Sequence, residues 1–155
     1  MSSQQRRRRG FSLIELLIVI AIILIIITVA VPKFQRVTVG AHDMAALKAI
    51  QTIHQMEVQY QSQFGRYANS LAELGPPASG AASAASADLI DGDLAQGVKG
   101  GYKFTLTGSN GGYVLTAAPE TYGKSGGKNF YSDDTMTIRQ NIGPEAATAN
   151  SPEVK

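Results

Sequence analysis

One uninterrupted apolar run, residues 11–31, constrains this chain more than any other feature of its sequence. As a helix these residues would extend over roughly 31 Å, about the thickness of the hydrocarbon core of a bilayer. Glu15 is the only charged side chain in the run. The run therefore predicts a helix that crosses a membrane once. Its carboxylate needs an explanation, because a charge near the bilayer centre costs roughly 2.5–3.5 kcal/mol on insertion scales.

Four consecutive arginines, Arg6 to Arg9, precede the apolar run and set its orientation. They contribute four of the 14 basic side chains, so the chain without residues 1–10 has 10 basic against 12 acidic side chains, or −2 instead of +2. The positive-inside rule places the arginines in the cytoplasm and the residues after the run outside it. The basic charge therefore belongs to the N-terminal arm, and nucleic acid is not expected as a partner.

Two ordinary explanations of residues 1–31 stay open beside a third. A secretory signal peptide would have a shorter apolar region, usually 7–15 residues, and "TVAVP" offers only Ala30 as a small residue before a cut. An uncleaved signal anchor fits the length of the run. Neither explains a carboxylate near the cytoplasmic edge or the presence of Gly10 where the charge stops.

The third explanation rests on a resemblance. The segment "GFSLIELLIVIAIILIIITVAVPKFQ" resembles the N-terminus of the type IV pilin superfamily, which includes the pilins and the pseudopilins of type II secretion. The resemblance implies that a prepilin peptidase cuts between Gly10 and Phe11 and methylates the new amino terminus at Phe11. Glu15 then stands fifth in the mature chain and pairs with the terminal ammonium of a neighbouring subunit in a filament. A buried carboxylate beside an opposite charge recovers much of its desolvation cost.

Pro32 falls at the twenty-second mature position, where pilins commonly carry a proline. Proline lacks a backbone N–H and disfavours a helical preceding residue, so we expect a kink near this position. Many pilins also carry a glycine at the fourteenth mature position, where this chain has Leu24. The resemblance thus leaves open how far the helix unwinds towards Leu24.

The remaining residues predict an α+β head on a long helix. Residues 1–10 form the leader, residues 11–32 the membrane and filament-core helix, and residues 33–64 its amphipathic half. That half has an apolar stripe and a polar face, and the stripe consists of Ala46, Ile50, Ile53, Met56, Tyr60 and Phe64. His42 and His54 are interpreted as surface or groove histidines.

We expect residues 65–140 to form a globular head. Within it, residues 76–99 are predicted to form a surface loop with weak helical character. Several segments alternate between apolar and polar residues, which predicts a small antiparallel sheet of three or four strands. The segments are separated by "SNGG" and by the turn at Ser132, Asp133 and Asp134. One face of this sheet would cover the long helix. Residues 141–155 have little apolar content and predict a flexible tail.

The sequence offers weak candidates for a metal and none for catalysis. Asp133 and Asp134 are possible calcium ligands by resemblance to some pseudopilins, and a plain turn is the competing interpretation. The "DGD" at Asp91 to Asp93 lacks EF-hand spacing and is also typical of a turn. No organic cofactor is expected. We find no phosphate-binding loop and no nucleophile–base pair, so an enzyme is not expected.

The sequence therefore predicts a structural subunit of a type IV pilus-like filament, a homo-oligomer anchored in the bacterial inner membrane by one pass. The resemblance implies a periplasmic C-terminal domain and three kinds of partner: a prepilin peptidase, an assembly ATPase and an inner-membrane platform protein. The alternative within the family is the major, G-type pseudopilin of a type II secretion system. The rival from another class is a membrane-anchored periplasmic binding module that never polymerises.

Overall fold

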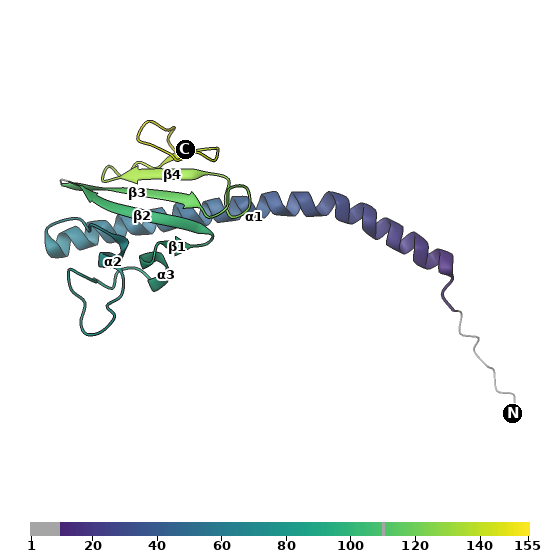
Figure 1. Cartoon of the computed structure of the whole chain (residues 1–155), viewed down its shortest axis with the longest axis horizontal. Helices are drawn as coiled ribbons and strands as arrows, with labels where there is room; N and C mark the ends of the chain where they lie inside the picture. Colours follow the sequence, from purple (N-terminus) through teal and green to yellow (C-terminus); the bar gives the residue numbers. More distant parts are fainter. Residues whose placement is uncertain (1–9, 110) are drawn as a thin grey trace, which may run out of the picture. The chain divides into compact units, whose positions relative to one another are not determined.

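The computed structural model describes residues 10–109 and 111–155. It divides into two units, Met1–Arg36 and Val37–Lys155; we call the second unit the head. One helix, α1 (Leu13–Phe64, 52 residues), contributes to both units. A sheet and two short helices complete the head (Figure 1). The predicted α+β fold, a long N-terminal helix followed by a small antiparallel sheet, is confirmed.

The first unit contains only the N-terminal part of α1 and the residues before it. Helix α1 is continuous through Leu24 and through Pro32. The described residues from Gly10 to Thr38 are all exposed, although most of them up to Val31 are large and apolar. The kink expected near Pro32 stays a prediction, and the helical assignment extends across it.

The head is built on the C-terminal part of α1. Its buried stripe includes Ala46, Ile50, Ile53 and Tyr60, as the spacing predicts, whereas Met56 and Phe64 are only partly buried. The predicted polar face, which includes Lys48, is exposed. Spacing of three and four residues places apolar side chains on one side of a helix, and burial of that side stabilises the head.

Five antiparallel strands follow one another in space as they do in sequence. They are β1 (Val98–Lys99), β2 (Tyr102–Ser109), β3 (Gly112–Pro119), β4 (Asn129–Asp133) and β5 (Arg139–Asn141). The sheet lies along the C-terminal half of α1 (Figure 1). Strand β2 buries alternate residues, Tyr102, Phe104 and Leu106. These apolar side chains belong to the same core cluster as the buried stripe of α1.

Residues 76–99 are more buried than the sequence predicts. The segment contains α3 (Gly92–Ala95), and α2 (Leu71–Leu74) precedes it. The backbone N–H groups of Leu89 and Ile90 both donate to Leu74 O, at 2.8 and 3.1 Å. Ala87, Ile90 and Leu94 are buried in the core. The expectation of a surface loop therefore holds only for the part before Ala87, because three apolar residues anchor the rest.

The C-terminal segment is the second departure from the sequence-based expectation. Residues 141–155 were expected to form a flexible tail, but in the structure this segment folds back on the edge of β5. Gln140 N donates to Pro152 O at 2.8 Å, and Val154 N donates to Ile138 O at 2.9 Å. Ala147 is buried. Pairing with the last residues covers the backbone groups that β5 would otherwise expose as an edge strand, a contact that apolar content alone does not reveal.

Candidate functional site

The first candidate site is the start of α1. Gly10, Phe11 and Ser12 precede the helix, which begins at Leu13. Ser12 O accepts hydrogen bonds from Glu15 N at 3.1 Å and from Leu16 N at 3.3 Å. The peptide bond between Gly10 and Phe11, where the sequence predicts cleavage, is therefore outside the helix.

Glu15 caps this helix start. Ser12 N donates to Glu15 Oε2 at 2.8 Å, which is one half of a capping box. A carboxylate in the first turn is also favoured by the positive end of the helix dipole. Glu15 remains exposed, and Ser12 N–H is the partner that the structure gives its side chain. The carboxylate is therefore held beside the backbone of Ser12.

The segment that follows Glu15 has no apolar partner within the described part of the chain. Helix α1 contains a stretch that is long and apolar enough to cross a membrane, and none of that stretch is buried. Exposed apolar surface of this extent marks a contact with lipid or protein. Arg6 to Arg9, which the sequence analysis assigns to the cytoplasmic side, lie outside the described residues.

The two histidines differ in environment, and the prediction for one of them was wrong. His42 is partly exposed, and its Nδ1 donates to Gly100 O at 2.7 Å. His54 is buried, with Nε2 2.9 Å from Ser132 Oγ. Because Ser132 Oγ donates its hydrogen to Thr137 O at 3.0 Å, His54 Nε2 carries the hydrogen of the shared bond. Burial lowers the pKa of His54, and the nearby Asp133 opposes this shift.

Two of the aspartates considered as calcium ligands, Asp133 and Asp91, already accept hydrogen bonds from nearby groups. Asp133 Oδ1 accepts hydrogen bonds from Thr135 N at 3.0 Å and Thr135 Oγ1 at 2.5 Å, which forms the predicted turn. Asp91 caps α3 by accepting from Leu94 N at 3.0 Å and pairs with Lys99. Lys99 is the main reason that the pKa of Asp91 lies below its usual value. Among residues 10–109 and 111–155, no three His, Cys, Asp or Glu side chains gather as metal ligands would. Calcium at Asp133 and Asp134 stays a hypothesis from sequence.

Three carboxylates of the head that were not expected to be functional, Asp43, Glu57 and Glu73, hold separate elements together. Asp43 is buried, and its Oδ1 accepts from Tyr102 Oη at 2.6 Å and from Gly127 N at 2.8 Å. These contacts join α1 to β2 and to the loop before β4. Tyr102 and Gly127 are both far from Asp43 in sequence, so periodicity along α1 could not reveal their association.

Glu73 organises the connection that follows α1, which we define as residues 65–70. Its Oε2 accepts from Arg66 Nη1 at 2.8 Å, Tyr60 Oη at 3.0 Å and Asn69 N at 3.1 Å. Burial alone would raise the pKa of Glu73, but these hydrogen bonds outweigh burial and lower it. Glu73 is therefore an ionised anchor, and it lies partly open to solvent.

Glu57 is the third carboxylate and is fully buried. Its Oε2 accepts from Ala68 N at 2.9 Å, whereas its Oε1 has no hydrogen-bond partner among the described residues. Burial is the main cause that raises the pKa of Glu57 to about 7. The only sequence signal was its place one turn from Ile53 and Tyr60, on the stripe that faces the core.

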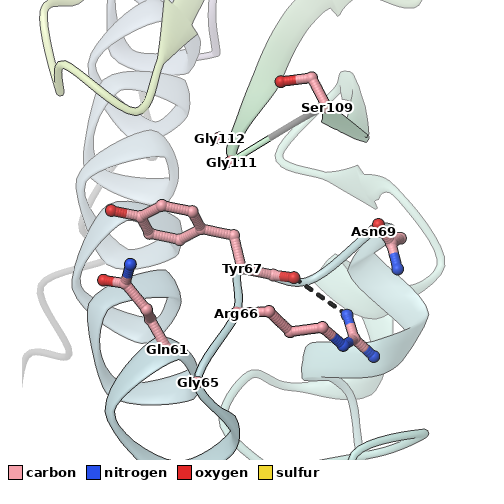
Figure 2. Close-up of a pocket in the computed structure, with 8 residues that line it drawn as sticks. All are labelled: Gln61, Gly65, Arg66, Tyr67, Asn69, Ser109, Gly111 and Gly112. Carbon is pink, nitrogen blue, oxygen red and sulfur yellow. Dashed lines mark hydrogen bonds between the residues drawn. The ribbon is translucent and has the colours of Figure 1, made fainter.

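A polar pocket of about 310 Å³ opens at the end of α1, between the connection and the β2–β3 hairpin. Figure 2 shows that Tyr67 and Arg66 point in different directions from adjacent positions. Arg66 Nη1 donates to Tyr67 O at 3.0 Å. The described lining residues include no Cys, His, Asp or Glu.

Comparison with known proteins gives one match. Residues 5–31 match the family model of the prokaryotic N-terminal methylation motif. The match covers less than a fifth of the chain, and it includes Gly10, Phe11 and Glu15. No curated protein and no solved structure matches this chain.

Proposed function

We propose that this chain, which carries the N-terminal methylation motif that is the hallmark of type IV pilins and pseudopilins, is a structural subunit of a type IV pilus-like filament. The motif and the apolar part of α1 fit anchoring in the inner membrane. The single observation that carries the proposal is this motif, placed at the start of a helix whose apolar surface has no partner in the described chain.

The processing steps follow from the motif and are supported by the geometry of the helix start. A prepilin peptidase would cut between Gly10 and Phe11 and methylate Phe11. Because both residues precede α1, the peptide bond between them requires no unwinding of the helix before it enters a protease. An assembly ATPase and an inner-membrane platform protein would then incorporate the mature subunit into the filament.

Glu15 would direct each subunit to its place in the filament. When the apolar segment leaves the membrane and packs among copies of itself, an ionised Glu15 becomes buried and needs a cation. The methylated amino terminus of a neighbouring Phe11 can supply that charge. A misplaced subunit would leave the carboxylate unpaired, and a buried unpaired charge typically costs about 3–5 kcal/mol.

A pseudopilin of a type II secretion system is the second candidate within the same family. The segment "GRYANSLAEL" and the absence of cysteine favour it. In the structure this segment forms the connection and α2, held by Glu73 rather than by a disulfide. In either case the head would lie on the periplasmic side of the membrane before assembly.

The test is mass spectrometry of the native protein and of its N-terminal peptide, from membrane and from sheared surface fractions. We expect a chain that begins at methylated Phe11. Its presence in the sheared fraction supports a surface pilus, whereas its restriction to the membrane fraction supports a short pseudopilus. A chain that retains Arg6 to Arg9 would overturn the proposal in favour of a plain membrane anchor. A start near Val31 would indicate a secreted soluble domain.

A further inference from the structure

Residues 120–128 join β3 to β4, and we call them the β3–β4 loop. In Figure 1, β3 ends on the side of the sheet from which α1 enters the head. The loop packs against the first turns of α1 within the head. Gly127 N donates to Asp43 Oδ1 at 2.8 Å, and a Cβ added to Gly127 would lie 3.2 Å from Val39 Cγ1. The loop is therefore fixed at the end of the head that lies next to the membrane anchor in the sequence.

The β3–β4 loop presents an aromatic ring and a cation to solvent. Its backbone is held by its own hydrogen bonds, since Thr121 O accepts from Lys124 N at 3.1 Å and from Ser125 N at 3.0 Å. Tyr122 is 44% exposed, and Lys124 is exposed as well. Lys124 takes part in none of the ion pairs formed within the part of the chain that the structure describes. The turn therefore leaves both side chains available to a partner outside the head.

A second apolar side chain is exposed at the same end of the head. Ile142, which directly follows β5, is 72% exposed. Asn129, the first residue of β4, pairs with Asn141, the last residue of β5. The side-chain nitrogen of Asn129, Nδ2, also donates to Gly143 O at 2.7 Å. These contacts place the backbone of Ile142 beside the start of β4, where the β3–β4 loop ends.

The distance of this end from a membrane is limited by the length of the chain. The apolar run ends at Val31, and Val39 follows eight residues later in the same helix. At a rise of about 1.5 Å per residue, these two residues are roughly 12 Å apart along α1. The headgroup layer occupies roughly 5–8 Å outside the hydrocarbon core on each side of a bilayer. If the apolar run spans the bilayer, the head therefore begins close to the phospholipid headgroups.

We propose that the β3–β4 loop and Ile142 form a surface that rests on the phospholipid membrane before assembly. Tyr122 and Ile142 enter the headgroup region, and the ammonium of Lys124 binds lipid phosphate groups. Tyrosine suits this position because its ring is apolar and its hydroxyl stays hydrated, and a lysine near the surface is attracted to anionic lipids. The exposed Glu120 and Glu145 oppose that attraction, so the apolar side chains are needed as well as the charge. The proposal rests on the membrane anchoring proposed above and adds a second lipid contact to the span.

The test uses tryptophan fluorescence, because the chain contains no tryptophan of its own. The full chain with Tyr122→Trp is reconstituted, at a high ratio of lipid to protein, in vesicles of phosphatidylcholine and phosphatidylglycerol. Lipids brominated on the acyl chains near the headgroup quench a tryptophan that enters the interface. Val58→Trp is the matched control, since Val58 is 43% exposed and lies roughly 28 Å further along α1 than Val39. We expect brominated lipid to quench Tyr122→Trp and to leave Val58→Trp unquenched.

Two further variants test the charge and provide a second apolar position. Adding Lys124→Gln to Tyr122→Trp should lower the ratio of docked to free heads by about fivefold in these vesicles. Ile142→Trp should be quenched as Tyr122→Trp is, and it keeps the test open if Tyr122→Trp fails to fold.

A reference tryptophan within the span, Leu24→Trp, separates failure of the docking from failure of the anchoring. If Leu24→Trp is quenched and neither Tyr122→Trp nor Ile142→Trp is, the head does not touch the membrane, while the anchoring stands. If none of the three is quenched, the anchoring and the docking are both wrong. A blue shift of Tyr122→Trp without quenching would mean that another copy of the chain covers this residue, which also contradicts the proposal.

Discussion

The two ends of α1 place similar residues in opposite environments. Near its start, the apolar side chains are exposed, and Glu15 accepts a hydrogen bond from the backbone of Ser12. Towards its end, Ile50 and Ile53 are buried, and Glu57 is fully enclosed. The C-terminal part of α1 is covered by its own chain, whereas the apolar surface of its N-terminal part has no cover among the described residues.

Two of the three carboxylates on α1, Glu15 and Glu57, illustrate the same contrast. Glu57 is enclosed where the chain offers the backbone N–H of Ala68, and burial raises its pKa to about 7. Glu15 accepts a hydrogen bond from Ser12 N and keeps an exposed carboxylate. Glu57 is therefore accommodated within the fold of the head, whereas the exposed Glu15 is the carboxylate to which we assign a role in assembly.

The largest expected effect comes from Glu15→Ala. We expect the variant to be inserted and to begin at Phe11, as the parent chain does, but to be absent from filaments, because the charge that pairs with a neighbouring amino terminus is lost. Immunoblots of sheared fractions, with N-terminal mass spectrometry of the membrane fraction, measure both properties.

Glu57→Gln is the matched control for that experiment, since it changes a carboxylate on the same helix. It should enter filaments normally. If Glu15→Ala entered filaments as well as Glu57→Gln does, the chain would be better described as a membrane-anchored module for which Glu15 has no role in assembly.

A smaller effect is expected from truncating one isoleucine at each end of α1, because only one of the two is packed in the core. Ile50→Ala should lower the free energy of unfolding of the head by about 2–5 kcal/mol, because it leaves a cavity in a filled core. Ile25→Ala removes the same atoms from a side chain that is 67% exposed, so it should change that free energy by less than about 0.5 kcal/mol. Chemical denaturation of both full chains in micelles, followed by tyrosine circular dichroism, measures the difference. Equal losses would mean that the N-terminal part of α1 contributes to the stability of the head.

The smallest expected effect is that of Asp43→Ala, which tests how much this buried carboxylate contributes to the stability of the head. Removal of the carboxylate leaves Gly127 N without its acceptor, and we expect a loss of about 1–3 kcal/mol in the free energy of unfolding. The exposed Asp93→Ala is the control and should change it by less than about 0.5 kcal/mol. A neutral result for Asp43→Ala would show that water replaces the carboxylate there.

Much of the fold follows from patterns that are local in the sequence. The spacing of Ile50, Ile53 and Tyr60 predicted the buried side of α1, and the alternation of β2 with the "SNGG" turn predicted the hairpin that pairs Ser109 with Gly112. The order of the strands was also accessible, since each strand pairs with the next in the chain. The sheet has one strand more than the upper expectation, because β1 is only two residues long and carries too little alternation to be recognised.

The errors concern contacts between distant parts of the chain. His54 was expected at the surface or in a groove, and it is buried in the head, where Ser132, on β4, offers it a partner. The C-terminal segment was expected to be free, and it pairs with residues at β5 through backbone groups that every residue possesses. Neither the identity of a residue nor the spacing of its neighbours contains this information.

By itself, the sequence determined the features that depend on length and order along one helix. These are a span of membrane thickness, the arginines before it, and the placement of Gly10, Phe11 and Glu15 that matches the methylation motif. Only the tertiary structure decided which polar groups lie inside the head. Asp43 and Glu57 have the polar character of surface residues, and they are buried because donors from later segments meet them there. Desolvation makes such positions costly without a donor, and those donors are placed only when the whole head has folded.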